Sequence, residues 1–167
     1  MRWVTNILFL CTGNSARSIL GEALLARKGT GRIQAYSAGS VPKGSVNPGA
    51  VRLLAREGFD LSHYRSKSWD EFALADAPAM DMVITVCASA AGEACPIWPG
   101  APIRAHWGLA DPANRLTNEA DADAAFAETY RLLGLRIEAL IALPFETMDK
   151  TALQAALAHI GQMEGAA

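Results

Sequence analysis

Segments with the character of buried strands alternate along this chain with segments that have helical periodicity. The strand candidates are residues 3–10, 33–39, 81–87 and 102–109. The helix candidates are residues 18–28, 48–58, 69–76, 121–143 and 149–162. Strands joined by helices form right-handed crossovers, which build a parallel sheet covered on both faces. The pattern therefore predicts an α/β fold, and a chain of 167 residues, 1–167, has the size of one domain.

Composition and charge exclude several classes of protein. Hydrophobic residues make up 51% of the chain and charged residues 19%, which is typical of a globular protein. The formal net charge of -2 provides no basic surface for nucleic acid. No apolar run reaches the roughly 18 residues of a membrane span, and the first residues lack the cleavage site of a signal peptide. We therefore expect a cytoplasmic protein with neither nucleic acid nor a membrane as a partner.

The first strand candidate ends at Cys11, which opens a short loop before a helix. Ligands of parallel sheets bind at the carboxyl ends of the strands, so this loop is well placed for chemistry. A tight turn here directs backbone N–H groups toward an anion, and Arg17, in the spacing C-x5-R, can donate two hydrogen bonds to a tetrahedral oxyanion. Gly13 permits a positive φ, and Asn14 tolerates the left-handed region better than most residues. The predicted oxyanion-binding loop is Thr12, Gly13, Asn14, Ser15, Ala16, Arg17 and Ser18.

The same loop is expected to activate Cys11. A free cysteine is only about 3% ionised at pH 7, and a positive loop lowers its pKa. Ser18 is positioned to donate a hydrogen bond to the sulfur. The alternatives are an inert core cysteine before an ordinary turn, and a nucleotide-binding loop. The nucleotide patterns GxxxxGK[ST] and GxGxxG are absent after this strand.

Two further cysteines, Cys87 and Cys95, lie close together in the chain. Three cysteines do not make the disulfide framework of a secreted protein, and no histidine lies at a metal-like spacing from any of them. We therefore expect no metal. The roles that remain for each thiol are core residue, nucleophile or redox partner.

Several motifs in order along the chain resemble those of one family. They are CTGNSARS at 11–18, YSAGS at 36–40, VNPGAV at 46–51, VITVC…CPIWPG at 83–100 and HWGLADPA at 106–113. The chain resembles the low-molecular-weight tyrosine phosphatase superfamily, and more closely its thioredoxin-coupled arsenate reductase branch. The resemblance implies a flavodoxin-like three-layer fold with a central four-stranded parallel sheet. A C-terminal helical extension, from about residue 144, lies outside the core resemblance.

The arsenate reductase resemblance also implies a mechanism. Cys11 attacks arsenate while Asp111 protonates the departing hydroxide, and Cys87 then attacks Cys11 and releases arsenite. Cys95 draws the disulfide outward, and thioredoxin or a similar dithiol protein reduces it. No cofactor is bound, and the electrons come from NADPH through thioredoxin reductase.

Two other functions remain open at this point. A low-molecular-weight phosphatase would use Cys11 and Asp111 for phosphomonoester hydrolysis through a phosphocysteine. Such phosphatases usually have an aromatic residue after the Asp-Pro pair, where this chain has Ala113. A silent oxyanion-binding module would have no need of Cys11, Arg17 and Asp111 together.

The resemblance also raises the question of a bound cation. Some relatives hold a potassium ion beside the loop with the asparagine matched by Asn14, and Glu22 and Ser37 match two further ligands. Lys67 stands where those relatives have an aspartate. Its ammonium group would compete with a cation, so the sequence argues against potassium binding.

Overall fold

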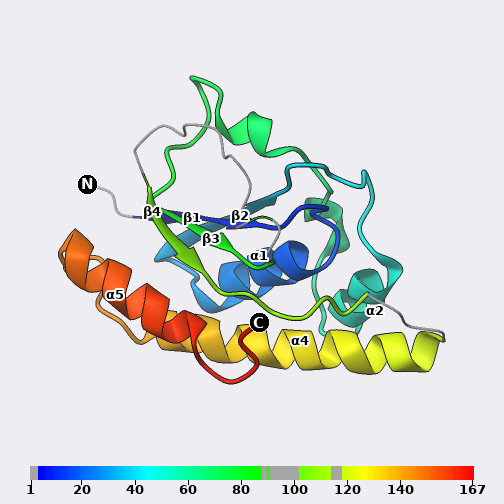
Figure 1. Ribbon diagram of the computed structural model, residues 1–167. Helices are drawn as coiled ribbons and strands as arrows, with labels where there is room; N and C mark the ends of the chain where they lie inside the picture. The colour runs from blue at the N-terminus through cyan, green and yellow to red at the C-terminus, as the bar shows by residue number, and fades with distance from the viewer. Residues whose placement is uncertain (1–3, 88–89, 91–101, 114–117) are drawn as a thin grey trace.

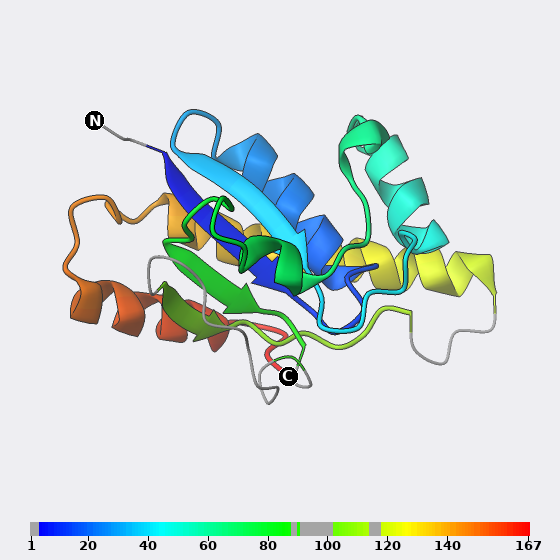
Figure 2. The same ribbon diagram turned by 90° about the horizontal axis from the view of Figure 1, so that it is seen from above.

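The computed structural model describes residues 4–87, 90, 102–113 and 118–167. Its centre is a parallel sheet with the strand order β2-β1-β3-β4, whose arrows all point the same way (Figure 2). The strands are β1 (Thr5–Leu10), β2 (Ile33–Ala38), β3 (Met82–Thr85) and β4 (Ile103–His106). The predicted α/β fold with a four-stranded parallel sheet is confirmed.

The central strand β1 explains why the sheet needs cover on both faces. Successive side chains of a strand point to opposite faces. Accordingly, Ile7 and Phe9 belong to the main hydrophobic core, whereas Leu8 and Leu10 belong to a second cluster on the other face. An uninterrupted apolar run is therefore the sequence signature of this strand.

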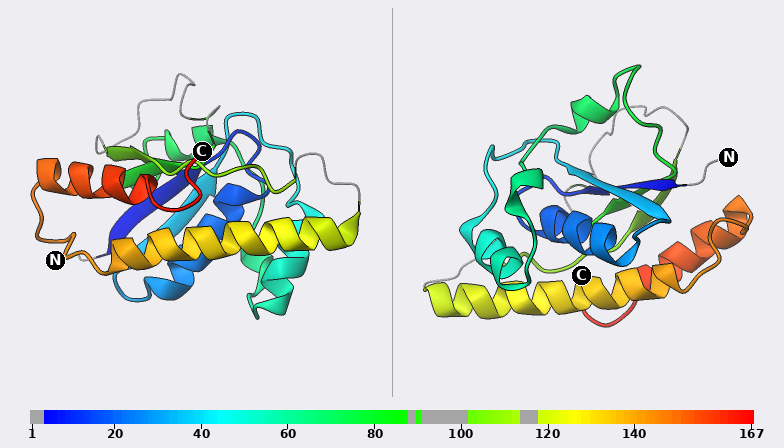
Figure 3. Two further views of the ribbon diagram at one scale, coloured as in Figure 1. Left: turned by 60° about the horizontal axis from the view of Figure 1, so that its bottom comes forward. Right: turned by 180° about the vertical axis from the view of Figure 1, so that it is seen from behind.

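Helices cover one face of the sheet. They are α1 (Arg17–Lys28), α2 (Pro48–Arg56), α4 (Glu119–Ile141) and α5 (Lys150–Gly161). Helix α1 lies between the sheet and α4 (Figure 3). The 3-10 helix η2 (Trp69–Phe72) lies above the opposite face (Figure 1), and a further 3-10 helix, η1 (Leu61–His63), follows α2. No helix in the described part of the chain is long and apolar enough to cross a membrane.

The helix expected over residues 69–76 is wrong in length. Only Trp69–Phe72 is helical, and it is a 3-10 helix capped by the Ser68 side chain. Phe72 is buried, but residues 74–76 are exposed. Short helices in proteins depend on packing of an apolar face. With one buried side chain, this segment has no face that would hold a longer helix.

The register of the sheet brings its carboxyl ends to one level. Leu10 pairs with Ala38 and with Thr85, and Thr85 pairs with His106. The segments that follow these four residues therefore meet at one edge of the sheet. Cys11, Cys87 and the Asp111 segment all belong to this edge.

The C-terminal helix supports the last of these segments. Helix α5 packs against β4, and the buried indole of Trp107 donates a hydrogen bond of 2.9 Å to the carbonyl of Leu157. Trp107 is the residue directly after β4. The start of the segment that carries Asp111 is thus fixed to α5.

Candidate active site

A cavity of about 470 Å³ lies at this edge of the sheet. It brings together Cys11, Arg17, Cys87 and Asp111, four of the five side chains that the sequence assigned to catalysis. The fifth, Cys95, lies outside the described residues. The cavity is lined by Cys11, Thr12, Gly13, Ser15, Ala16, Arg17, Val41, Pro42, Lys43, Cys87, Asp111 and Ala113.

The loop at the bottom of the cavity is held by Asn14, which is fully buried beneath it. The Asn14 amide nitrogen donates to Ser18 Oγ (2.9 Å) and to Ser37 Oγ (3.0 Å), and its oxygen accepts from the Lys67 backbone N–H (2.8 Å). Three separate segments thus fix the shape of the loop.

One expectation about the loop, a hydrogen bond from Ser18 to Cys11, needs correction. Asn14 has a φ of 43°, but Gly13 is not among the described residues with positive φ. The asparagine alone takes the left-handed conformation here, because its side chain makes three hydrogen bonds there. Ser18 accepts from Asn14, and no hydrogen bond from Ser18 to Cys11 occurs within the described residues.

Arg17 and the start of α1 give the cavity its affinity for an anion. No side chain of the described residues caps the N-terminus of α1, so its first N–H groups remain available. Arg17 Nη1 donates to the Leu109 carbonyl at 2.7 Å, and its buried Nε has no partner in the described structure. A buried N–H without a partner is costly, and an oxyanion in the cavity would satisfy it.

Asp111 lines the cavity beside Arg17. Its Oδ2 is 3.8 Å from Arg17 Nη2, and its Oδ1 accepts from the Ala113 N–H at 3.0 Å. The side chain is 43% exposed. A carboxyl group that is held by its own turn and open to solvent can exchange protons with water and with a ligand in the cavity.

Cys11 and Cys87 are both buried and are not joined in a disulfide. Both sulfurs line the cavity, and each shifts the pKa of the other. The Cys87 sulfur also accepts from the backbone N–H groups of Thr12 and Ala90, both at 3.4 Å. The hydrogen bond from Cys11, followed by these N–H groups and the Thr12 hydroxyl, lowers the pKa of Cys87 to about 5.

The same hydrogen bond changes the prediction for Cys11. Arg17 and the Gly13 N–H lower the pKa of Cys11, as expected from the loop. The hydrogen bond to Cys87 and burial outweigh them, and they raise the pKa of Cys11 above its usual range. The interaction between the two thiols therefore acts in opposite directions: it raises the pKa of Cys11 and lowers that of Cys87.

Lys67 extends beneath the loop into the cluster of Asn14, Ser37 and Glu22. Its Nζ donates to Ser37 Oγ at 3.4 Å and lies 3.8 Å from Glu22 Oε1, and Ser37 Oγ donates to the same Glu22 oxygen at 2.5 Å. Burial raises the pKa of Glu22 and lowers that of Lys67, while the opposite charge of each partner counters both shifts. The structure therefore places the Lys67 ammonium group among the side chains that matched a cation site.

One wall of the cavity was not predicted from the sequence; it is formed by Val41, Pro42 and Lys43. These residues follow β2, and their backbone is hydrogen-bonded to the loop: Val41 N–H to Thr12 O (2.9 Å) and Lys43 N–H to Gly13 O (3.0 Å). The one available signal was their position just after the YSAGS motif.

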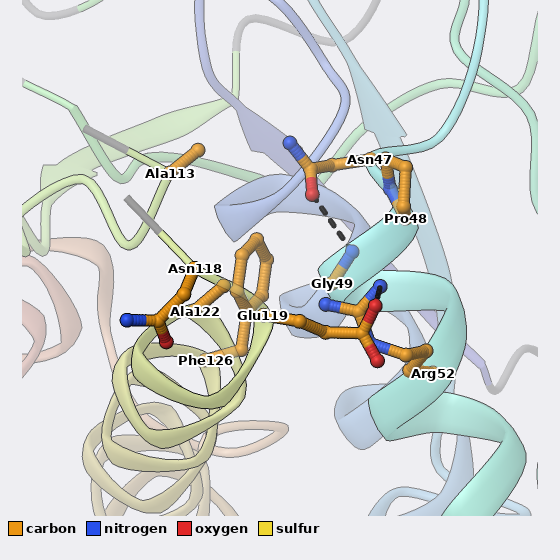
Figure 4. Close-up of a pocket in the computed structure, with 9 residues that line it drawn as sticks. All are labelled: Asn47, Pro48, Gly49, Arg52, Ala113, Asn118, Glu119, Ala122 and Phe126. Carbon is orange, nitrogen blue, oxygen red and sulfur yellow. Dashed lines mark hydrogen bonds and ion pairs between the residues drawn. The ribbon is translucent and has the colours of Figure 1, made fainter. Parts of the chain in front are cut away.

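A second cavity, of about 330 Å³, adjoins the first at Ala113 (Figure 4). It lies between the N-terminus of α2 and the N-terminal part of α4. Asn47 caps α2 through the Gly49 N–H at 2.8 Å, and the Phe126 ring packs directly over Gly49. Arg52, which also lines this second cavity, forms ion pairs with Asp123 and Glu119. This cavity is therefore a seam between two helices, with its charge already paired.

Comparison with known proteins places this geometry in a family. Residues 6–155 match the family described as low molecular weight phosphotyrosine protein phosphatase. An arsenate reductase of Halalkalibacterium halodurans is 37% identical over 132 residues, which cover 79% of this chain and 91% of that relative.

Solved structures similar to this one include arsenate reductases. One described as an arsenate reductase in the phosphate binding state has a TM-score of 0.66 and 28% identity, over 83% of this chain and 98% of its own. The thioredoxin-dependent arsenate reductase of Corynebacterium glutamicum has a TM-score of 0.54 and 25% identity, over 81% of this chain and 62% of its own. With its sheet, its loop and most of its length matched, the chain belongs to the low molecular weight phosphotyrosine protein phosphatase family.

Proposed function

We propose that this protein is an arsenate reductase that works through an intramolecular disulfide relay. The observation that carries the proposal is the presence of two thiols, Cys11 and Cys87, in the one cavity that Arg17 and Asp111 also line. Hydrolysis of a phosphate ester needs one thiol, whereas reduction of arsenate needs two electrons and therefore a second thiol. The similarity to arsenate reductases supports the same reading.

Arsenate binds first, at the positive end of the cavity. The loop N–H groups and Arg17, including its unpartnered Nε, donate to the arsenate oxygens. The Cys11 sulfur then attacks arsenic and forms an S–As bond, while the bond between arsenic and one hydroxyl group breaks. Asp111 donates a proton to the departing hydroxyl, which leaves as water, and the proton given up by the Cys11 thiol returns to Asp111 through solvent.

The second step transfers the electrons. Cys87 attacks the sulfur of Cys11, an S–S bond forms, and the electron pair of the S–As bond passes to arsenic, which leaves as arsenite. The thiolate is the attacking form in such exchange, and the lowered pKa of Cys87 keeps it available near neutral pH. Both cysteines line the same cavity, so the two sulfurs can meet without a rearrangement of the sheet.

Cys95 completes the relay by attacking Cys87, which frees Cys11 for another cycle. Thioredoxin, or a similar dithiol protein, then reduces the Cys87–Cys95 disulfide with electrons from NADPH. A reducing compartment such as the cytoplasm suits this chemistry, because the three thiols must start in the reduced form.

Phosphatase activity is the second candidate, as a side reaction of the same loop. Cys11, Arg17 and Asp111 are also what phosphoryl transfer through a phosphocysteine requires. The cavity has Ala113 where an aromatic wall would hold an aryl ring. We therefore expect weak hydrolysis of aryl phosphates.

The test is arsenate-dependent NADPH oxidation in the presence of thioredoxin and thioredoxin reductase, run beside an aryl phosphate assay. We expect steady turnover with arsenate and slow release of the aryl product. Rapid aryl phosphate hydrolysis without arsenate-dependent oxidation, with glutaredoxin also tried as the donor, would refute the reductase assignment.

A further inference from the structure

Lys43 lies over the active-site loop in a position that its backbone fixes. Its N–H donates to the Gly13 carbonyl at 3.0 Å. The Ser66 hydroxyl forms a second link between the same two segments: it donates to the Gly13 carbonyl (3.2 Å) and accepts from the Gly44 N–H (3.1 Å). The chain at Lys43 is thus tied to the loop.

The side chain of Lys43 lies along the loop as well. A Cβ atom added at Gly13 would be 3.3 Å from Lys43 Cγ and 3.2 Å from Lys43 Cε. The methylene stem therefore lies directly against Gly13, which is a reason for glycine there that does not involve φ. Lys43 lines the cavity, and its Cε, which bears the ammonium group, lies beside the loop.

The other cations near the cavity already have partners. Arg17 contacts the Leu109 carbonyl and faces Asp111, and Lys67 lies beneath the loop with Ser37 and Glu22. For the Lys43 ammonium group, no described residue supplies a hydrogen bond or an ion pair. Lys43 is thus the lining cation whose charge is left for a ligand.

We propose that Lys43 is a substrate-binding residue whose ammonium group contacts the outward oxygens of the oxyanion held by the loop. The proposal rests on the function proposed above for the choice of substrate, but the contact itself requires only a tetrahedral oxyanion. Arsenate is an anion at neutral pH, whereas arsenite is a neutral acid. Lys43 therefore favours binding of the substrate over retention of the product.

The test is the affinity for inorganic phosphate, measured by calorimetry on the reduced protein, together with the arsenate KM. In Lys43→Gln we expect the phosphate Kd and the arsenate KM to rise by about twofold to fivefold, as for a partly exposed ion pair, with kcat nearly unchanged. Lys43→Arg should restore most of the affinity. The salt dependence of phosphate binding should become weaker in Lys43→Gln, because one charge contact is lost.

Lys150→Gln is the matched control, because it removes the same charge at an exposed residue that begins α5 and does not line the cavity. It should bind phosphate like the wild type. An unchanged phosphate Kd in Lys43→Gln would overturn the proposal, as would a fall in kcat alone. Lost phosphate affinity in a protein without arsenate turnover would support Lys43 as an oxyanion ligand and refute the reductase function instead.

Discussion

At the scale of single residues, the chemistry of the cavity depends on what surrounds its two sulfurs. The N–H groups of Thr12 and Ala90 donate to Cys87 and favour its thiolate form. At Cys11, the proposed nucleophile, Arg17 and the Gly13 N–H favour the thiolate, whereas the interaction with Cys87 and burial oppose it. The hydrogen bonds to Cys87 thus keep a thiolate available for the second step of the proposed relay.

The cysteines separate the two candidate activities. Cys11→Ser should abolish arsenate reduction and any aryl phosphatase activity, because both begin at this sulfur. Cys87→Ser should keep aryl phosphate hydrolysis within a small factor of wild type but release no arsenite. Cys95→Ser should release about one arsenite per molecule and stop as a Cys11–Cys87 disulfide, which thioredoxin reaches poorly. Peptide mapping would identify that linkage.

Wild-type arsenate turnover in both Cys87→Ser and Cys95→Ser would eliminate the relay. Residual activity of either kind in Cys11→Ser would remove Cys11 as the nucleophile.

The lowered pKa of Cys87 leads to a prediction for pH. An ordinary cysteine has a pKa of about 8.5, so its alkylation slows nearly a hundredfold between pH 8 and pH 6. A group whose pKa is lowered to about 5 stays ionised over this range and loses its charge only as the pH falls through that value. Iodoacetamide labelling of Cys87 in the native protein, followed by mass spectrometry, should therefore change little between pH 8 and pH 6.

The urea-unfolded protein is the control, and it should show the full hundredfold decrease. A native profile that parallels the unfolded one would mean that Cys87 is protonated at rest.

At the scale of elements, the packing of α2 on α4 requires a glycine. A Cβ atom at Gly49 would lie 2.5 Å from a ring atom of Phe126, so one of the two helices would have to move. We expect Gly49→Ala to lower the free energy of unfolding by roughly 1–3 kcal/mol, as is typical of overpacking. Gly134→Ala is the control, because nothing lies within 4 Å of its added Cβ. There alanine should add up to about 1 kcal/mol of helix stability.

Denaturant titration of the two variants measures both changes. Equal stabilities of Gly49→Ala and Gly134→Ala would show that α2 and α4 are not packed as described.

The elements were largely predictable, and the contacts between them were not. Periodicity locates the four strands and the α-helices, because burial on one or two faces determines the spacing of apolar residues. The helix predicted over residues 69–76 was too long, because helix length depends on packing partners that the local sequence does not contain. Lys43 was missed for the same reason: its role depends on a backbone pairing with Gly13, thirty residues earlier. The charge on Cys87 likewise depends on a neighbour across the sheet edge.

At the scale of the whole molecule, the cluster of Lys67, Glu22, Ser37 and Asn14 connects the loop to α1, β2 and the segment before η2. Its internal ammonium group occupies the position of a cation. Melting temperature and arsenate turnover should therefore be nearly equal in potassium and sodium salts at matched ionic strength. Thermal unfolding and steady-state assays in the two salts would measure this. A potassium-specific rise in melting temperature would show that a metal ion still binds in this cluster.

The contact between Cys11 and Cys87 has a consequence for the timing of the reaction. Both electrons for one reduction are stored in the folded chain before arsenate arrives. Substrate and electron donor never need to be bound together, so the cycle divides into two half-reactions. One fully reduced molecule can detoxify one ion far from any donor, and the donor can restore it later. In its reduced form the protein thus carries reducing equivalents away from the donor, in addition to catalysing the reaction.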